Sequence, residues 1–210
     1  MDPTEQRRLL DTVLAAAAAE DCLVAPVGSV YFLFHDAARL STKDVDAVIH
    51  TASLAVAPLD VLKRVAAKLG DVEVTVDEAV AWIQLASGEK IELIRGRSAA
   101  KGGFFPRELL EEAAASAERR ENLLLYPMEY VILLKADAAI DREERAVRDA
   151  ARAEEHRRRA AGFRADVFSE VNRAMLGAGL DAAKLRSGIA CLKRKRQAAV
   201  TELLQAAGAL

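Results

Sequence analysis

The sequence has few cysteines and histidines, and neither type is arranged for metal binding. The two cysteines, Cys22 and Cys191, are far apart and do not lie at metal-site spacing. The three histidines, His35, His50 and His156, also share no metal spacing. We therefore expect a reducing environment without a cysteine- or histidine-based metal site, and a disulfide between the two cysteines is the alternative.

Long apolar runs are also absent. No stretch reaches the roughly 18 apolar residues that a membrane-spanning helix needs. The first ten residues, MDPTEQRRLL, are polar and do not resemble the start of a signal peptide. Repeats are lacking too, apart from an alanine run at 15–19 that is ordinary in a helix. These absences predict a cytoplasmic protein with no membrane partner.

What the chain does have is ample apolar content and many charges. Its 210 residues are 52% hydrophobic and 30% charged, which suits one globular unit or a domain with a helical appendix. The net charge of -2 is unevenly placed: residues 1–141 hold 15 basic and 23 acidic side chains, and residues 142–210 hold 15 and 9. A basic C-terminal half fits a nucleic-acid or phosphate partner, and solvated arginine-rich helices are the alternative. The basic runs HRRRAAGFR and LKRKRQ leave the same two interpretations open.

Apolar periodicity and turn residues predict an α+β fold. Strands are expected at 22–28, 44–50 and 71–76, followed by a hairpin at 81–96, with helices at 2–21, 29–40 and 57–70. Further helices are expected near 106–119, 127–139, 142–160, 163–177 and 181–206, and strands cease at about residue 95. The sequence thus predicts a mixed-sheet α/β core at 1–105 and an all-helical C-terminal region at 106–210.

Two acids on one predicted strand carry the first indication of chemistry. Asp44 and Asp46 are two residues apart in an apolar run, so their side chains point to the same face. Two such carboxylates repel each other, and burying them is costly unless a cation lies between them. Magnesium binds carboxylate oxygens together with substrate phosphates. The pair therefore predicts a magnesium site, and a strand-end turn is the alternative.

A glycine–serine pair lies just before this strand. Gly28 permits a tight turn and a close approach to a ligand, and Ser29 begins a predicted helix whose free N–H groups attract phosphate. Together with the acid pair, this bend could hold a nucleoside triphosphate with its magnesium. Glu92, in the apolar run KIELI, is the best candidate for a third acid. Glu73 is the second candidate, and an exposed residue on an edge strand is its plainer explanation.

At this point the sequence resembles a known family. The order G-S, helix, R-x-S-T-K-D-V-D resembles minimal nucleotidyltransferases of the DNA polymerase β-like superfamily, in particular relatives of the AbiEii-type toxin nucleotidyltransferases. A second block, YPMEYVILLKADAAIDREERAVRDAAR, resembles the family's later lysine and aspartate segment. The resemblance spans roughly residues 20–152. The matching positions are Gly28, Ser29, Arg39, Thr42, Asp44, Asp46, Glu92, Lys135 and Asp149.

The resemblance implies transfer of a nucleoside monophosphate from an NTP to an RNA, such as tRNA, or to a protein. Asp44, Asp46 and Glu92 would hold two Mg²⁺ ions, and Glu92 could also take the acceptor's proton. The implied nucleotide-binding residues are Gly28, Ser29, Arg39, Thr42 and Lys43, and the implied further catalytic residues are Lys135 and Asp149. A toxin–antitoxin or phage-defence role, with a cognate antitoxin as partner, follows from the same resemblance.

Several alternatives remain open. The chain could be a catalytically inactive nucleotide-binding or interaction module of the same fold, or a basic helical RNA-binding protein. Arg39 and Lys43 could be surface charges at a helix end. Lys135 could be a snorkelling lysine, and Asp149 could pair with a neighbouring arginine on its helix.

Overall fold

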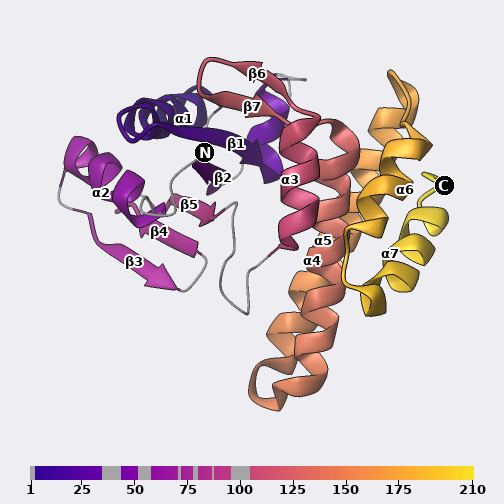
Figure 1. The fold of residues 1–210 in the computed structure, drawn as a ribbon. Helices are drawn as coiled ribbons and strands as arrows, with labels where there is room; N and C mark the ends of the chain where they lie inside the picture. Colours follow the sequence, from indigo (N-terminus) through magenta and orange to yellow (C-terminus); the bar gives the residue numbers. More distant parts are fainter. Residues whose placement is uncertain are drawn as a thin grey trace. The chain divides into compact units, whose positions relative to one another are not determined.

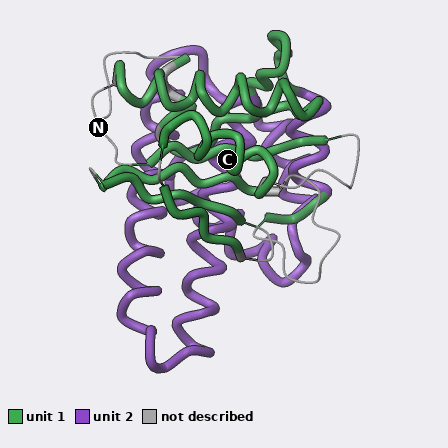
Figure 2. Tube along the Cα trace, turned by 90° about the vertical axis from the view of Figure 1, so that its left-hand side faces the viewer, with its two compact units in different colours: residues 1–107, 117–125 green, residues 108–116, 126–210 purple. Residues whose placement is uncertain are grey.

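The structure, a computed structural model, describes residues 3–34, 44–51, 58–70, 72–77, 80–86, 88–95 and 105–210. The chain forms two compact units, which Figure 2 draws in green and purple. Unit 1 comprises Met1–Arg107 and Ala117–Leu125, and unit 2 comprises Glu108–Ser116 and Tyr126–Leu210. The chain therefore leaves unit 1, returns to it once, and leaves it again.

Unit 1 is built on a seven-stranded sheet in the order β3-β4-β5-β2-β1-β7-β6 (Figure 1). Its strands are β1 (Cys22–Val27), β2 (Asp44–Thr51), β3 (Val74–Asp77), β4 (Val80–Gln84), β5 (Lys90–Arg95), β6 (Glu118–Arg120) and β7 (Leu123–Leu125). The sheet is mixed, because β2 pairs with β5 and β1 with β7 in parallel, while the other pairs are antiparallel.

Two helices, α1 (Pro3–Ala18) and α2 (Pro58–Leu69), pack on one face of this sheet. Their apolar residues form a core with alternate residues of the strands, among them Val45, Ala47 and Ile49 of β2. Because strand side chains alternate between faces, Asp44 and Asp46 point to the face opposite the two helices. The apolar pattern of β2 thus fixes the side of the sheet on which the acids lie.

The segment after β1 is a seven-residue 3-10 helix, η1 (Gly28–Phe34). Val30 and Tyr31 are buried. The sequence predicted a longer helix over 29–40, of which residues 35–40 lie outside the described residues. Over the described part, the tighter i→i+3 winding replaces the α-helix that the apolar spacing suggested.

The prediction that strands cease at about residue 95 is wrong. The hairpin of β6 and β7 follows the first helix of the second half, and β7 pairs with β1 at Val24↔Leu123. Glu121, at φ 55°, lies in the turn between the two strands. A three-residue run such as Leu123–Leu125 is too short to show the alternation by which a strand is recognised, so this strand could not be predicted.

Unit 2 contains the helices of the second half. These are α3 (Arg107–Ala115), α4 (Met128–Arg148), α5 (Ala153–Leu176), α6 (Ala182–Ala190) and α7 (Arg194–Ala206), with a short 3-10 turn, η2 (Ala150–Arg152), between α4 and α5. The region α4–α7 is all-helical, and together with the mixed sheet it confirms the predicted α+β fold class.

The helix boundaries in unit 2 differ from the predicted ones. The helices expected at 127–139 and 142–160 meet without a break inside α4, and the chain turns instead at Asp149. The side chain of Asp149 accepts a hydrogen bond from the backbone N–H of Arg152, so Asp149 caps the start of η2, the turn that follows α4. The helix expected at 181–206 is split into α6 and α7, and Asp181 caps the start of α6.

One basic residue of the run LKRKRQ is not on a solvated face. Arg196 is 3% exposed and donates to Asp137, which is fully buried, and to Asp141 and Glu144. Burial raises the pKa of Asp137 against the opposing effect of Arg196. Burial alone would also raise the pKa of Glu144, but its hydrogen bonds from Arg196 and Lys195 lower it to about 2. Arg196 therefore joins α7 to α4 through an internal ion network.

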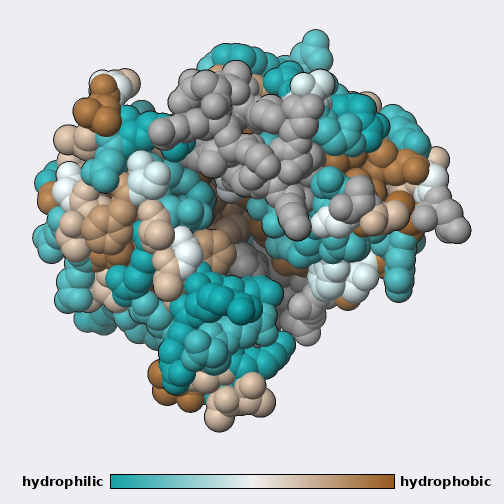
Figure 3. All heavy atoms as spheres, turned by 180° about the vertical axis from the view of Figure 1, so that it is seen from behind, coloured by the Kyte–Doolittle hydropathy of each residue, from teal (hydrophilic) through white to brown (hydrophobic). Residues whose placement is uncertain are grey.

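The face drawn in Figure 3 is mainly hydrophilic, and its hydrophobic residues form small separate groups. Within the described ranges, no helix combines the length and apolar character needed to cross a bilayer.

Candidate functional site

The glycine bend and the second aspartate lie next to each other in unit 1. In the antiparallel pair of β1 and β2, Val27 is opposite Asp46, so Gly28 follows directly beside that aspartate. Gly28 has φ +62°, and a Cβ at this position would lie 2.8 Å from Asp46 Oδ2. Glycine is thus required twice, for the left-handed backbone and for the space that the carboxylate takes. The Asp46 carboxylate therefore lies beside the bend.

The third predicted acid lies in the neighbouring strand. In the parallel pair of β2 and β5, Asp46 is the register partner of Glu92, and Asp44 is the register partner of Lys90. Register partners on adjacent strands have their side chains on the same face, about 4.8 Å apart across the sheet. The strand order therefore brings Asp44, Asp46 and Glu92 to one face, although the last comes from much later in the chain.

Two further residues on this face were not predicted to belong to the site. Trp82 of β4 is the register partner of Glu92, and Lys90 lies two residues before Glu92 on β5. The Lys90 ammonium pairs with the Glu92 carboxylate and lies 5.0 Å from the centre of the Trp82 ring. The spacing that singled out the two aspartates could have found Lys90, because it shares a face with Glu92 by the same alternation.

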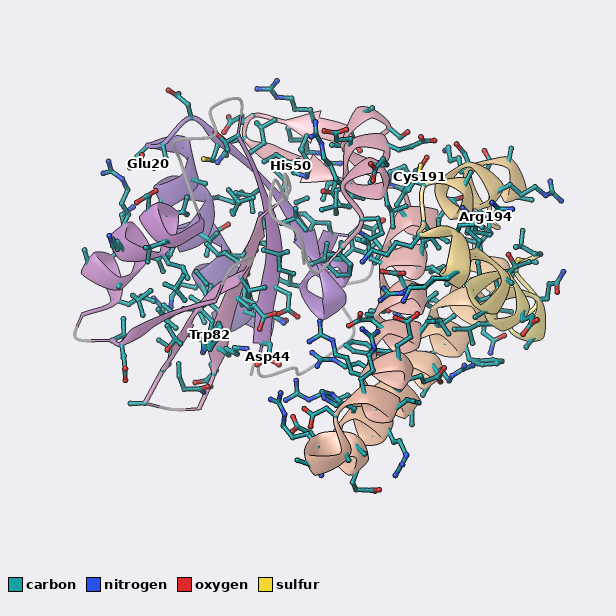
Figure 4. The ribbon with its side chains drawn as sticks, turned by 60° about the horizontal axis from the view of Figure 1, so that its bottom comes forward. Glu20, Asp44, His50, Trp82, Cys191 and Arg194 are labelled. Atoms are coloured by element: carbon teal, nitrogen blue, oxygen red, sulfur yellow. The ribbon has the colours of Figure 1, made fainter. Side chains whose placement is uncertain are left out.

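The start of β2 is held by α1. The side chain of Gln6, which is fully buried, donates a hydrogen bond of 3.1 Å to the backbone carbonyl of Asp44. Figure 4 shows Asp44 and Trp82 near one end of the sheet and His50 near the other. Asp44 is exposed and Asp46 half-buried, so the acid pair lies where the strand comes to the surface.

The donor chemistry of this face fits magnesium, since carboxylate oxygens are the ligands that Mg²⁺ prefers. Among the residues that the structure describes, however, no group of three or more His, Cys, Asp and Glu side chains is positioned to hold a metal ion. Glu92, the third acid, is engaged by Lys90 instead. Metal ligation by Asp44, Asp46 and Glu92 therefore stays a prediction.

Lys135 and Asp149 belong to unit 2, where both have ionic partners. Lys135 pairs with Glu170 and, at 3.3 Å, with Asp166. Burial raises the pKa of Glu170, and the charge of Lys135 opposes that rise. Asp149 pairs with Arg152 at 2.9 Å, and the hydrogen bond from Arg152 lowers the pKa of that carboxyl. These pairs account for the position of both residues within unit 2, and their catalytic roles stay predictions.

The structure describes only some of the other residues that were predicted to belong to the site. Ser29 lies in η1, directly after Gly28. Arg39, Thr42 and Lys43 lie outside the described residues. Glu73, the second candidate for the third acid, is exposed and lies just before β3.

No protein-family model matches the sequence. No curated protein matches it significantly. Among solved structures, the chain is similar to the antibiotic-resistance factor ANT(2'')-Ia, at 19% identity and a TM-score of 0.46, covering 96% of this chain and 97% of that chain. JHP933 from Helicobacter pylori is 15% identical with a TM-score of 0.39, covering 98% and 91%. A candidate nucleotidyltransferase from H. pylori is 16% identical with a TM-score of 0.40, covering 97% and 93%.

Proposed function

We propose that this protein is a magnesium-dependent nucleotidyltransferase that moves a nucleoside monophosphate from an NTP to an RNA or protein acceptor. The observation that supports this most directly is the approach of Gly28 to the Asp46 carboxylate, with Glu92 as the register partner of that aspartate. The glycine lets the backbone of the bend come close to a carboxylate that could bind a cation, so the cation and a phosphate held by the bend would be neighbours. The sequence resemblance to the polymerase β-like superfamily points to the same chemistry.

The proposed step is an in-line attack by an acceptor hydroxyl on the α-phosphorus. A new bond forms between the acceptor oxygen and phosphorus, the bond to the β-phosphate oxygen breaks, and pyrophosphate leaves. The hydroxyl proton passes to Glu92. Asp44, Asp46 and Glu92 are the proposed ligands for Mg²⁺, which when bound neutralises charge on the triphosphate. The backbone near Gly28 and Ser29 is the proposed contact for the phosphates.

The proposal includes a biological setting. An AbiEii-type relative would act in the cytoplasm as part of a toxin–antitoxin or phage-defence pair, with an antitoxin as its protein partner. This setting is supported by the resemblance of the G-S, helix, R-x-S-T-K-D-V-D motif to that family. Arg39, Thr42, Lys43, Lys135 and Asp149 retain their proposed roles in nucleotide binding and catalysis.

Label transfer tests the proposed activity. The protein is incubated with each α-labelled NTP, Mg²⁺ and either total RNA or total protein, and labelled products are separated on gels. We expect transfer with at least one NTP, abolished by EDTA and reduced by about 10²-fold or more in Asp46→Asn, because the residue that holds the cation and orients the phosphates is lost. Asp11→Asn, an exposed aspartate on α1, is the matched control and should retain transfer.

One observation favours a second candidate function. The pairing of Glu92 with Lys90 keeps the third acid occupied, as expected of a module that binds nucleotide without transferring it. NTP binding without label transfer to any acceptor, for example by equilibrium dialysis, would favour this module. If no NTP binds in the presence of Mg²⁺, both candidates are contradicted.

A further inference from the structure

We propose that Lys90 regulates cation binding at the site by competing with divalent metal for the Glu92 carboxylate. This inference rests on the proposed function. In the absence of ligand the Lys90 ammonium serves as the counter-charge of the third acid. A divalent cation can use Glu92 only when Lys90 leaves it.

The surroundings of Lys90 support a specific position for its ammonium group. It pairs with Glu92 and lies 5.0 Å from the centre of the Trp82 ring, a distance at which a cation is attracted to the ring face. The side chains of Lys90 and Glu92 are 28% and 21% exposed, so the pair is largely withdrawn from water. Asp44, the register partner of Lys90, adds a further negative charge on the same face.

Lys90 offsets part of the repulsion among the three acids on this face. Like charges on adjacent strands repel each other, and a lysine among them supplies the opposite charge. A triphosphate would attract the same ammonium group, since lysine is a mobile point charge on a flexible stem. Lys90 would then move from Glu92 to the phosphates and leave the carboxylate for the cation. Nucleotide and metal would therefore favour each other's binding.

Cation titration of the nucleotide-free full chain tests this competition. Mn²⁺ binding is followed by electron paramagnetic resonance for the wild type, Lys90→Met, Glu92→Gln and the double variant. We expect Lys90→Met to bind Mn²⁺ about tenfold more tightly or to bind an additional ion. Glu92→Gln alone should change little, because Glu92 is already occupied, and the double variant should lose the gain. Lys68→Met, an exposed lysine on α2, should match the wild type.

Fluorescence provides a second readout, because Trp82 is the only tryptophan of the chain. Adding Mg²⁺ and a non-hydrolysable NTP should change its emission in the wild type, as Lys90 moves off the ring. The change should be absent in Lys90→Met, and Lys90→Arg, which keeps the charge, should retain it. Circular dichroism establishes that each variant is folded.

The outcomes separate this inference from the proposed function. If Lys90→Met binds Mn²⁺ as the wild type does while label transfer persists, the competition is wrong and the enzyme assignment stands. If the double variant still binds Mn²⁺ more tightly than the wild type, Glu92 is not the carboxylate for which Lys90 competes, and the inference is again wrong. If the gain appears as expected but no NTP is ever transferred, the competition holds and the enzyme assignment is contradicted.

Discussion

Replacing Gly28 with alanine should lower the stability of the protein modestly and its label transfer strongly. An L-residue in left-handed backbone costs roughly 1–2 kcal/mol, and Gly28 has φ +62°. The new Cβ would also lie 2.8 Å from Asp46 Oδ2, closer than real side chains allow, so the carboxylate must move. For a chain of this size, 1 kcal/mol corresponds to roughly 2–4 °C, so the thermal midpoint should fall by about 2–8 °C.

The effect on chemistry should be larger. A displacement of a catalytic group by about 1 Å costs on the order of 10²-fold in rate, and the Asp46 carboxylate must be displaced to admit the methyl group. Label transfer should therefore fall about 10²-fold, and Mn²⁺ affinity should fall with it. Both are measured at a temperature well below the midpoint, where circular dichroism shows that the variant is folded.

Gly70→Ala provides the matched control. Gly70 has φ +98° and lies just after α2 in the same unit, but a Cβ there would meet no atom within 4 Å. It should lower the midpoint by a similar amount or more and leave Mn²⁺ affinity and transfer unchanged. Equal losses of transfer in both variants, or wild-type Mn²⁺ affinity in Gly28→Ala, would refute the reasoning that the glycine makes room for the carboxylate.

Other predictions concern unit 2. Arg196→Met should cost about 3–5 kcal/mol of unfolding free energy in urea, because it leaves the buried Asp137 carboxylate without its partner; a loss below 1 kcal/mol would contradict this. Because the pKa of Glu144 is lowered on folding, its contribution to stability is present above the unfolded value of 4.5 and is lost as the pH falls to about 2. In Glu144→Gln, the free energy of unfolding should therefore depend less on pH over that range. Gly188→Ala should destabilise by about 1–3 kcal/mol, because its Cβ would collide with a leucine of α4, whereas Gly162→Ala, in open space on α5, should stabilise by about 0.5–1 kcal/mol; the opposite order in thermal melts would contradict the packing described.

The fold class was predictable because unit 1 obeys simple alternation. In β2, apolar residues at 45, 47 and 49 alternate with Asp44 and Asp46, so one pattern indicates both the strand and the face that carries the acids. The helix α2 was equally predictable, since proline begins it and Gly70 follows its end. An element can be predicted from the sequence where its apolar residues repeat with the period of the element and all lie on its buried face.

Elements that depend on distant partners could not be predicted in this way. The strand β7 exists because its backbone pairs with β1, and three leucines do not reveal that pairing. The burial of Arg196 depends on acids some 50 to 60 positions earlier in the chain, which a basic run does not indicate. That Lys90 lies beside Glu92 was predictable, because residues two apart in a strand share a face. A search for acids alone does not find it.

The late position of β7 has a consequence for synthesis on the ribosome. The outer edge of β1 is covered by a strand that ends at Leu125, after α3 has already been made. Until that point the nascent sheet ends at β1, whose unpaired N–H and C=O groups could pair with another chain. A protein stopped at residue 105 would keep this open edge permanently, so we expect such a fragment to self-associate, whereas one extended through residue 125 carries its own cover.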